Sequence, residues 1–240
     1  MTSPKNQFLA DYHRLRPISN RLGTLAGEKI TKPTVVSEGK LLGLWQEGRL
    51  ALESDEELNA LLDHLVHDGH GGAKTPLEHI TAKKIEALGP EAPRVHAALC
   101  KARLNLYLLT KCRPGLGWEV IDIWRNQKFL VVDEALSEMP EAKGFMAVMR
   151  LANMGEWCFN TGLQGSTIGP QKLATLHALL VASPLVDIAP SDFHPNAFTT
   201  EQNLLWSRSL LRAWLRPGSV KLVTIPIEVG MKETKARKGR

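Results

Sequence analysis

Residues 63–70 contain a cluster of side chains of the types that bind divalent metals. Histidines at positions 64, 67 and 70 are spaced three apart, and Asp63 precedes them. At this spacing two imidazoles lie on one helical turn and the third follows in a loop, which suits a divalent metal ion. One hypothesis is therefore a metal-dependent hydrolase that uses Asp63, His64, His67 and His70. The alternative is that the histidines are solvated or capping residues at the negative end of a helix, where positive charge is favourable.

A second group combines aromatic rings with cations in the middle of the chain. Trp118, Trp124 and Trp157 lie in or beside expected strands, and basic residues flank them. Small barrels bind single-stranded nucleic acid in this way, because bases stack on aromatic rings while cations attract phosphates. The alternative is a core position for each tryptophan, although Trp124 stands at a hairpin tip and is harder to bury. The predicted nucleic-acid site comprises Lys111, Arg113, Trp124, Arg125, Lys128, Lys235, Arg237, Lys238 and Arg240, with Arg150 nearby.

No catalytic constellation is recognisable elsewhere in the sequence. The chain has no serine in a nucleophile elbow and no glycine-rich phosphate loop between a strand and a helix. The central acidic residues Glu119, Asp122, Asp133 and Glu134 are expected to be solvated residues of alternating strands. Three widely spaced cysteines contain no C-x-x-C pair and are expected as buried free thiols. The expectation leans towards a protein that is not an enzyme and needs no cofactor, with the divalent metal as the alternative.

The net charge of +5 belongs to the two ends of the 240-residue chain. Residues 1–33 and residues 232–240 each carry +4, so the segment 34–231 carries −3. A basic end supplies phosphate affinity that is independent of sequence, although short basic termini are also common as solubilising extensions. The first 30 residues lack a signal-peptide pattern, and no apolar run reaches the roughly 18 to 20 residues that span a bilayer. We therefore expect a cytoplasmic protein without a membrane partner.

Helical signals dominate the chain ahead of its centre. Ser54 with Glu57 and Thr75 with Glu78 have the capping-box spacing, in which each side chain bonds a free amide of the first turn. Helices are expected around 8–15, ending before Pro17, over 37–45, from 55, from 76 and over 93–103, with a brief strand at 49–53.

The centre of the chain shows short apolar or alternating runs separated by turn signals. Five such runs lie between Leu104 and Gly162, and the turn signals include Pro114 to Gly117 and Arg125 to Gln127. This punctuation is typical of consecutive antiparallel hairpins. We therefore predict an α+β fold: a helical N-terminal part, a central antiparallel five-stranded meander or small barrel, C-terminal helices and a final edge strand.

The C-terminal part returns to helical spacing. Helices are expected over 170–182 and from Thr199 or Thr200 to Leu215, and a strand over 220–229, whose Pro226 favours an edge position. The predicted organisation has a basic N-terminal segment, a single α+β domain and a basic tail. Their ranges are 1–33, 34–231 (helical 34–103, β-rich 104–162, helical plus strand 163–231) and 232–240.

Several motifs occur together over about residues 58–162: Leu61 to Asp68, Thr75 to Glu78, Arg103 to Leu109, Pro114 to Gly117, Val120 to Asp122, Phe129 to Ser137 and Asn160 to Gly162. With these motifs the stretch resembles a family of uncharacterised bacterial proteins of planctomycete type. The resemblance implies a shared architecture, and it implies no activity and no site residues.

These observations favour a cytoplasmic binding or adaptor module. Single-stranded nucleic acid is the first candidate partner, through the central barrel and the basic ends. A protein-interaction module is the second reading, and the metal-dependent hydrolase is the third. The sequence leaves the oligomeric state open.

Overall fold

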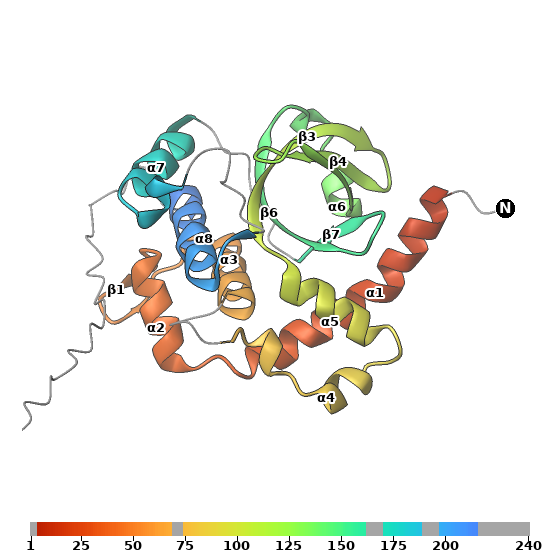
Figure 1. The fold of residues 1–240 in the computed structure, drawn as a ribbon, viewed down its shortest axis with the longest axis horizontal. Helices are drawn as coiled ribbons and strands as arrows, with labels where there is room; N and C mark the ends of the chain where they lie inside the picture. The colour runs from red at the N-terminus through yellow and green to blue at the C-terminus, as the bar shows by residue number, and fades with distance from the viewer. Residues whose placement is uncertain (1–3, 69–73, 162–169, 189–196, 216–240) are drawn as a thin grey trace, which may run out of the picture.

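The computed structural model describes residues 4–68, 74–161, 170–188 and 197–215. It consists of a small barrel with helices against its outer surface, as Figure 1 shows with the barrel seen end-on. The helices are α1 (Pro4–Gly27), α2 (Lys32–Leu41), α3 (Asp55–His67), η1 (Leu77–His79), α4 (Ala82–Glu86), α5 (Ala92–Lys101), α6 (Glu134–Ser137), η2 (Pro140–Ala142), α7 (Pro170–Val181), η3 (Pro184–Asp187) and α8 (Thr200–Leu215). The strands are β1 (Trp45–Gln46), β2 (Arg49–Leu50), β3 (Leu104–Arg113), β4 (Gly117–Asp122), β5 (Gln127–Val132), β6 (Met146–Asn153) and β7 (Cys158–Asn160).

The predicted α+β fold with a central five-stranded barrel is confirmed. The strand order is β3-β4-β5-β7-β6, and β6 closes the barrel by pairing with β3. All pairings are antiparallel except that of β5 with β7, which is parallel through Val131 and Cys158. A purely antiparallel meander is therefore wrong in this detail, because α6, η2 and β6 separate β5 from β7 in the chain.

Alternation along the strands divides the core into three parts. Odd-numbered residues of β6, such as Met149, belong to a cluster built from all five strands and α6, which fills the barrel. Even-numbered residues of β6 point to the helices: Val148 joins the cluster around α3, α7 and α8, and Ala152 joins the cluster around α1 and α5. Residue 150 lies between these two outer clusters, so β6 is buried on both faces.

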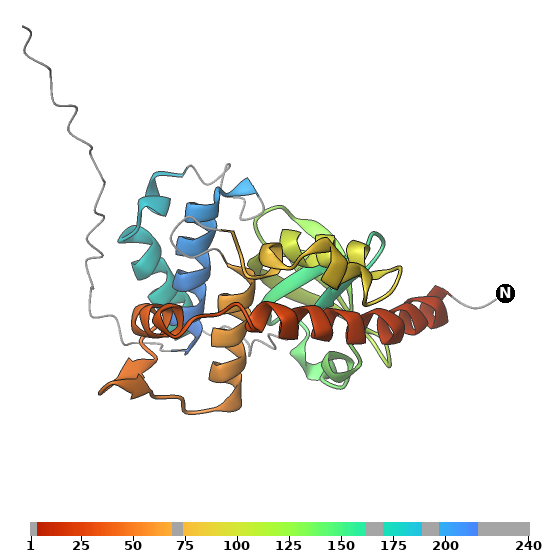
Figure 2. The ribbon, with the colours of Figure 1, turned by 90° about the horizontal axis from the view of Figure 1, so that it is seen from below.

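Helix α1 is longer than the sequence indicates. A helix ending before Pro17 is wrong, because α1 continues through this proline to Gly27. Proline removes one backbone hydrogen bond from a helix interior, and the burial of Leu15, Leu22 and Ala26 offsets that loss. Figure 2 shows α1 running along one side of the molecule, beside the barrel.

Both predicted capping boxes have side chains in place. The Ser54 hydroxyl accepts from the Glu57 amide at 3.3 Å and starts α3, while the Glu57 carboxylate accepts from the Glu53 amide at 2.7 Å. Thr75 and Glu78 bond each other reciprocally, but they start only the single turn η1. The single helix expected from residue 76 is wrong, because this segment is divided into η1 and α4.

Three further elements complete the comparison with the expected boundaries. The helix expected over 37–45 begins five residues earlier and ends at Leu41, as α2, because Thr31 caps it and Pro33 occupies its first turn. Helices α7 and α8 are confirmed, and Thr199 with Gln202 forms a capping box at the start of α8. The strand expected over 220–229 and the basic tail lie outside the described residues. Within the described segments no helix has both the length and the apolar character to cross a bilayer.

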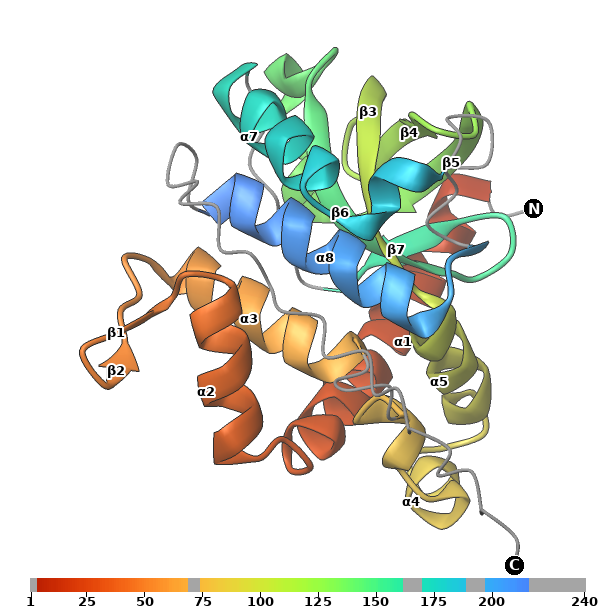
Figure 3. The same cartoon turned by 60° about the vertical axis from the view of Figure 1, so that its left-hand side comes forward.

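Helix α8 lies against the barrel and fixes the position of α3. Figure 3 shows α8 crossing the outside of the barrel, with α3 and α7 on either side of it. The indole nitrogen of the buried Trp206 donates to the Leu104 carbonyl at 2.9 Å and joins α8 to the start of β3. As a result α2, α3, α8 and β6 meet at one place, where the polar groups described next are buried.

Candidate functional site: a buried charge network beside an open cleft

Arg150 of β6 is a fully buried charge that faces helix α3. Its Nε donates to Asp63 Oδ2 at 2.8 Å, and its two Nη atoms donate to the carboxylate of Asp68 at 3.2 and 2.7 Å. The Ala102 carbonyl lies 3.4 Å from Nη1. A planar guanidinium suits two carboxylates at once, because its donors project in a fixed fork.

Helix α3 supplies the acceptors through residues four apart. Asp63 and His67 form one such pair, and His64 and Asp68 form the other. His64 lies between two carboxylates: Nδ1 is 2.9 Å from Asp68 Oδ2, and Nε2 is 3.0 Å from Glu38 Oε2. Only the imidazolium form can donate from both ring nitrogens, so His64 is held as a cation.

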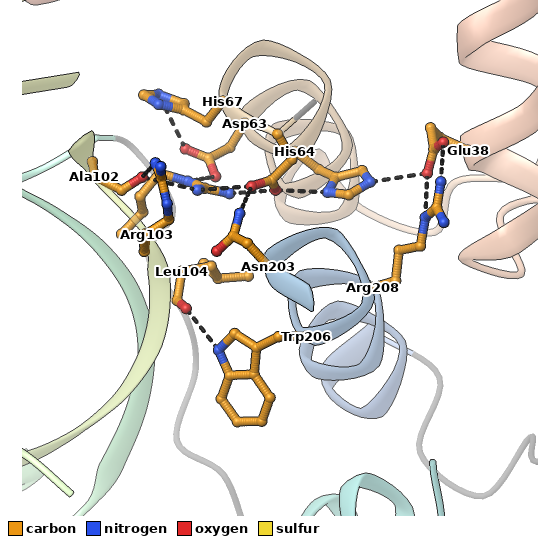
Figure 4. A network of polar contacts seen from close by, with 12 residues as sticks. Glu38, Asp63, His64, His67, Ala102, Arg103, Leu104, Asn203, Trp206 and Arg208 are labelled. Atoms are coloured by element: carbon orange, nitrogen blue, oxygen red, sulfur yellow. Dashed lines mark hydrogen bonds and ion pairs between the residues drawn. The ribbon is translucent and has the colours of Figure 1, made fainter. Parts of the chain in front are cut away.

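Helices α2 and α8 complete the network. Arg208 donates two hydrogen bonds to the Glu38 carboxylate, at 2.9 and 2.6 Å, and Asn203 donates to Asp68 at 2.9 Å. Figure 4 shows the chain of contacts from His67 across α3 to Arg208. Three carboxylates therefore meet two guanidiniums and one imidazolium, and the charges of these six groups balance. Arg103 is a further cation beside them and donates to the Cys100 and Ala102 carbonyls.

The pKa values of these groups follow from their partners. Burial alone lowers the pKa of His64, but the hydrogen bonds and charges of Asp68 and Glu38 outweigh burial and raise it. Burial opposes ionisation of Asp63 and Asp68 as well, yet Arg150 holds the pKa of both carboxyls below their ordinary range. The two acids thus remain ionised around neutral pH.

His67 differs from His64, because no carboxylate of the described residues is close enough to it to form a strong bond. Its Nε2 is 3.7 Å from Asp63 Oδ1. Burial lowers its pKa to about 4, and Arg150 adds to this effect, while Asp63 and the backbone of Leu99 oppose it. Nδ1 is buried without a hydrogen-bond partner among the described residues. A buried unpaired polar atom costs about 1–3 kcal/mol and calls for an explanation.

An open cleft of about 510 Å³ lies beside this network, between α1 and α3. The buried side chains Val66, Leu77, Leu99 and His67 form its inner wall, whereas Asn20, Thr24, Asn59 and the apolar Leu62 are exposed at its rim. The lining residues are Ser19, Asn20, Gly23, Thr24, Gly27, Ile30, Asn59, Leu62, Asp63, Val66, His67, Leu77, Leu99 and Thr161. The Thr161 hydroxyl donates to Asp63 Oδ1 at 2.6 Å, which couples the cleft to the network.

Two glycines keep this cleft open. Gly23 and Gly27 lie one turn apart on the face of α1 that borders the cleft, and a Cβ at either position would have no atom within 4 Å. Glycine inside a helix costs about 0.5–1 kcal/mol relative to alanine. Since no neighbouring atom excludes a side chain at either position, steric packing does not explain why both residues are glycine.

The residues of the metal hypothesis are only partly brought together. His64 has both nitrogens committed to carboxylates, and Asp63 is bound by Arg150 and Thr161. His70 lies outside the described residues. Within residues 4–68, 74–161, 170–188 and 197–215, no group of three or more histidine, cysteine, aspartate or glutamate residues is placed to hold a metal ion.

The residues of the nucleic-acid hypothesis fall into separate places. Lys111 and Arg113 lie at the β3–β4 turn, where Arg113 pairs with Glu119. Trp124, Arg125 and Lys128 lie at the β4–β5 turn, at the opposite end of these strands. The remaining members, Lys235, Arg237, Lys238 and Arg240, lie outside the described residues.

Two residues expected at the nucleic-acid surface, one aromatic and one basic, instead pack against other residues of the protein. The Trp124 ring packs edge-on against Trp206, with centroids 5.7 Å apart, and belongs to the margin of the core. Arg150, expected as a nearby phosphate-binding cation, is fully buried and bound to Asp63 and Asp68. Arg125 and Lys128 are exposed.

Sequence reasoning missed several members of the network and of the cleft. A signal existed for Arg150, because a lone charge in the apolar run MAVMRLA implies a buried partner. Glu38, Asn203 and Arg208 carry no comparable signal, since they lie on amphipathic helices where polar residues are ordinary. Gly23 and Gly27 had a weak signal as glycines one turn apart within a helix.

Fold and site together define an α+β protein with a closed five-stranded barrel, a neutralised charge network and a polar-rimmed cleft. The chain belongs to a family of unknown function, DUF7986, whose model matches residues 6–165. This match includes every described residue that lines the cleft, whereas Asn203 and Arg208 of α8 lie beyond it. No curated protein and no solved structure gives a significant match.

Proposed function

We propose that this protein is a binding module whose ligand is a small molecule held in the cleft between α1 and α3. The observation that carries the proposal is the cleft itself: about 510 Å³ of open space, lined by buried apolar groups and by a buried histidine. Small-molecule sites typically have volumes of roughly 300–1,000 Å³ and combine an apolar wall with a few polar groups. Both features are present here.

The packing of the barrel supports this location. Its interior is filled by large side chains, including the fully buried Trp118, whose indole donates to the Leu136 carbonyl of α6 at 2.9 Å. Figure 1 shows α6 across one end of the barrel. A ligand inside the barrel would have to displace this core, whereas the cleft needs no such change.

The experiment is a fragment screen by ligand-observed NMR on three proteins. Gly23→Leu places a side chain in the cleft, and Ala10→Leu places the same side chain on the exposed part of α1 as a matched control. We expect fragments that bind the wild type and Ala10→Leu but lose at least tenfold in affinity with Gly23→Leu. If Gly23→Leu weakens the binding of no fragment found in the screen, the proposal is contradicted.

Binding of single-stranded nucleic acid is a second candidate, favoured by one observation. Arg125 and Lys128 are both exposed at the same tight turn, where Asn126 has a left-handed backbone conformation with φ of 53°. In this proposal the two cations and the basic tail contact phosphates, so affinity falls as salt concentration rises.

Fluorescence anisotropy with a labelled single-stranded oligonucleotide at low salt tests this second proposal. The double variant Arg125→Ala/Lys128→Ala and deletion of residues 232–240 should each weaken binding, whereas Arg113→Ala should leave it unchanged, because Arg113 is already paired with Glu119. Absence of binding at micromolar protein, or equal affinity of all variants, removes the nucleic-acid proposal.

A cytoplasmic location and a bacterial, planctomycete-type origin also stay predictions, which rest on the sequence features described above.

A further inference from the structure

The described wall of the cleft offers no free charge to a ligand. Among the described residues its lining contains no lysine, arginine or glutamate, and Asp63 and His67 are the only titratable ones. The other lining groups are hydroxyls, amides, glycines and aliphatic side chains. Whether a ligand ion could find a counter-charge therefore depends on these two residues.

Asp63 is already neutralised from the side away from the cleft. One carboxylate oxygen accepts from Arg150 at 2.8 Å, and the other accepts from Thr161 at 2.6 Å. A cationic ligand would have to compete with Arg150 for this carboxylate. An anionic ligand would meet the carboxylate first, since Arg150 is fully buried behind it.

His67 does not change this balance. Its ring is uncharged at neutral pH, because burial lowers its pKa to about 4. The six ion-paired groups of the network, three carboxylates and three cationic groups, balance one another behind the wall. The neighbouring cation Arg103 donates to the Cys100 and Ala102 carbonyls and is not among the described residues that line the cleft. An ion that left water for this cleft would lose hydration without gaining a partner.

The distribution of polar groups along the cleft indicates which end of a ligand is apolar and which end is polar. Val66, Leu77 and Leu99 are buried at the inner wall, whereas Asn20 and Asn59 are exposed at the rim. We infer that the cleft takes an uncharged small molecule, with an apolar ring or chain against the inner wall and hydroxyl or amide groups at the solvent end. This inference rests on the proposed function and specifies the chemical class of its ligand.

Three probes with one ring system test the charge preference. Naphthamide is uncharged, naphthoate is an anion and naphthylmethylammonium is a cation at neutral pH, while their apolar parts are the same. We expect naphthamide to bind the wild type at least tenfold more tightly than either ion, by NMR titration at pH 7. We also expect Gly23→Leu to abolish this preference and Ala10→Leu to keep it.

The outcomes separate the inference from the proposed function. If an ion binds as tightly as the amide and Gly23→Leu displaces it, the inference is overturned while the small-molecule site stands. If naphthamide binds equally well to Gly23→Leu, or if none of the three probes binds, the inference is also overturned. In those cases the fragment screen alone decides the proposed function.

Discussion

Replacing Arg150 by methionine should destabilise the protein mainly by stranding the Asp63 carboxylate. Asp68 keeps His64 and Asn203 as partners, whereas among the described residues Asp63 keeps only the Thr161 hydroxyl and the distant His67 ring. Methionine fills much of the space of the arginine stem, so the loss is chiefly electrostatic. Breaking a buried ion pair from one side costs about 3–5 kcal/mol.

Protonation sets an upper limit on the cost of the stranded charge. Neutralising an aspartate of ordinary pKa, about 3.9, costs about 4 kcal/mol at pH 7 and about 1.5 kcal/mol at pH 5. We therefore expect Arg150→Met to lower the free energy of unfolding by about 3–4 kcal/mol at pH 7. The loss should be at least about 1 kcal/mol smaller at pH 5, because the stranded carboxyl then takes up a proton more easily.

Urea unfolding of wild type and variants at both pH values measures this difference. Arg113→Met is the matched control: it breaks the partly exposed pair with Glu119 on the same barrel and should cost at most about 1 kcal/mol. If Arg150→Met does not fold alone, Asp63→Asn/Arg150→Met should recover part of the loss, since it removes the stranded charge. A loss below about 1 kcal/mol at pH 7, or one that is equal at both pH values, would refute the reasoning.

Three further predictions concern protonation and glycine. The folded-state pKa of His64 is raised, so its contribution to stability is complete below about pH 6.5 and is lost as the pH rises; His64→Gln should flatten urea-unfolding stability above this pH. His67 has a folded pKa of about 4, so wild-type stability falls as the pH drops from about 6.5 towards that value, and His67→Phe should remove this dependence. Gly117→Ala should destabilise the barrel by more than about 3 kcal/mol, because the backbone there has φ of 150° and the added Cβ would overlap the Val131 carbonyl. Gly23→Ala should instead raise the melting temperature, because its Cβ meets no atom and alanine favours a helix by about 0.5–1 kcal/mol over glycine. A melting temperature that falls with Gly23→Ala, or is unchanged by Gly117→Ala, contradicts the glycine prediction.

Long-range pairing explains which parts of the network the sequence could not give. Arg150 meets Asp63 across 87 positions of chain, and Arg208 meets Glu38 across 170. The spacing of His64 and His67 on α3 indicates a polar helix face, and the metal hypothesis used that spacing alone. Which groups oppose this face depends on how β6 and α8 pack against it, and they supply guanidiniums and an amide.

The sequence was also insufficient to predict how the aromatic and basic residues of the expected nucleic-acid surface are arranged in space. Trp124 stands at a hairpin tip, a position that indicates exposure, yet α8 brings Trp206 edge-on to its ring. The strand register then places Lys111 and Arg113 at the other end of β3 and β4. Sequence distance thus gave the residue types of a binding surface but not their arrangement.

Local sequence determined the elements of this protein: the five central strands, α7, α8 and the caps of α3 and η1 follow from alternation, apolar spacing and hydrogen bonds within four residues. Only the tertiary structure decided that β5 and β7 run parallel, that α1 passes through Pro17, that Arg150 balances two acids, and that Gly23 and Gly27 face open space. The physical reason is the separation along the chain over which each kind of interaction acts. Backbone and capping preferences act between neighbours in the chain, whereas burial, charge neutralisation and empty volume depend on segments that meet only after folding.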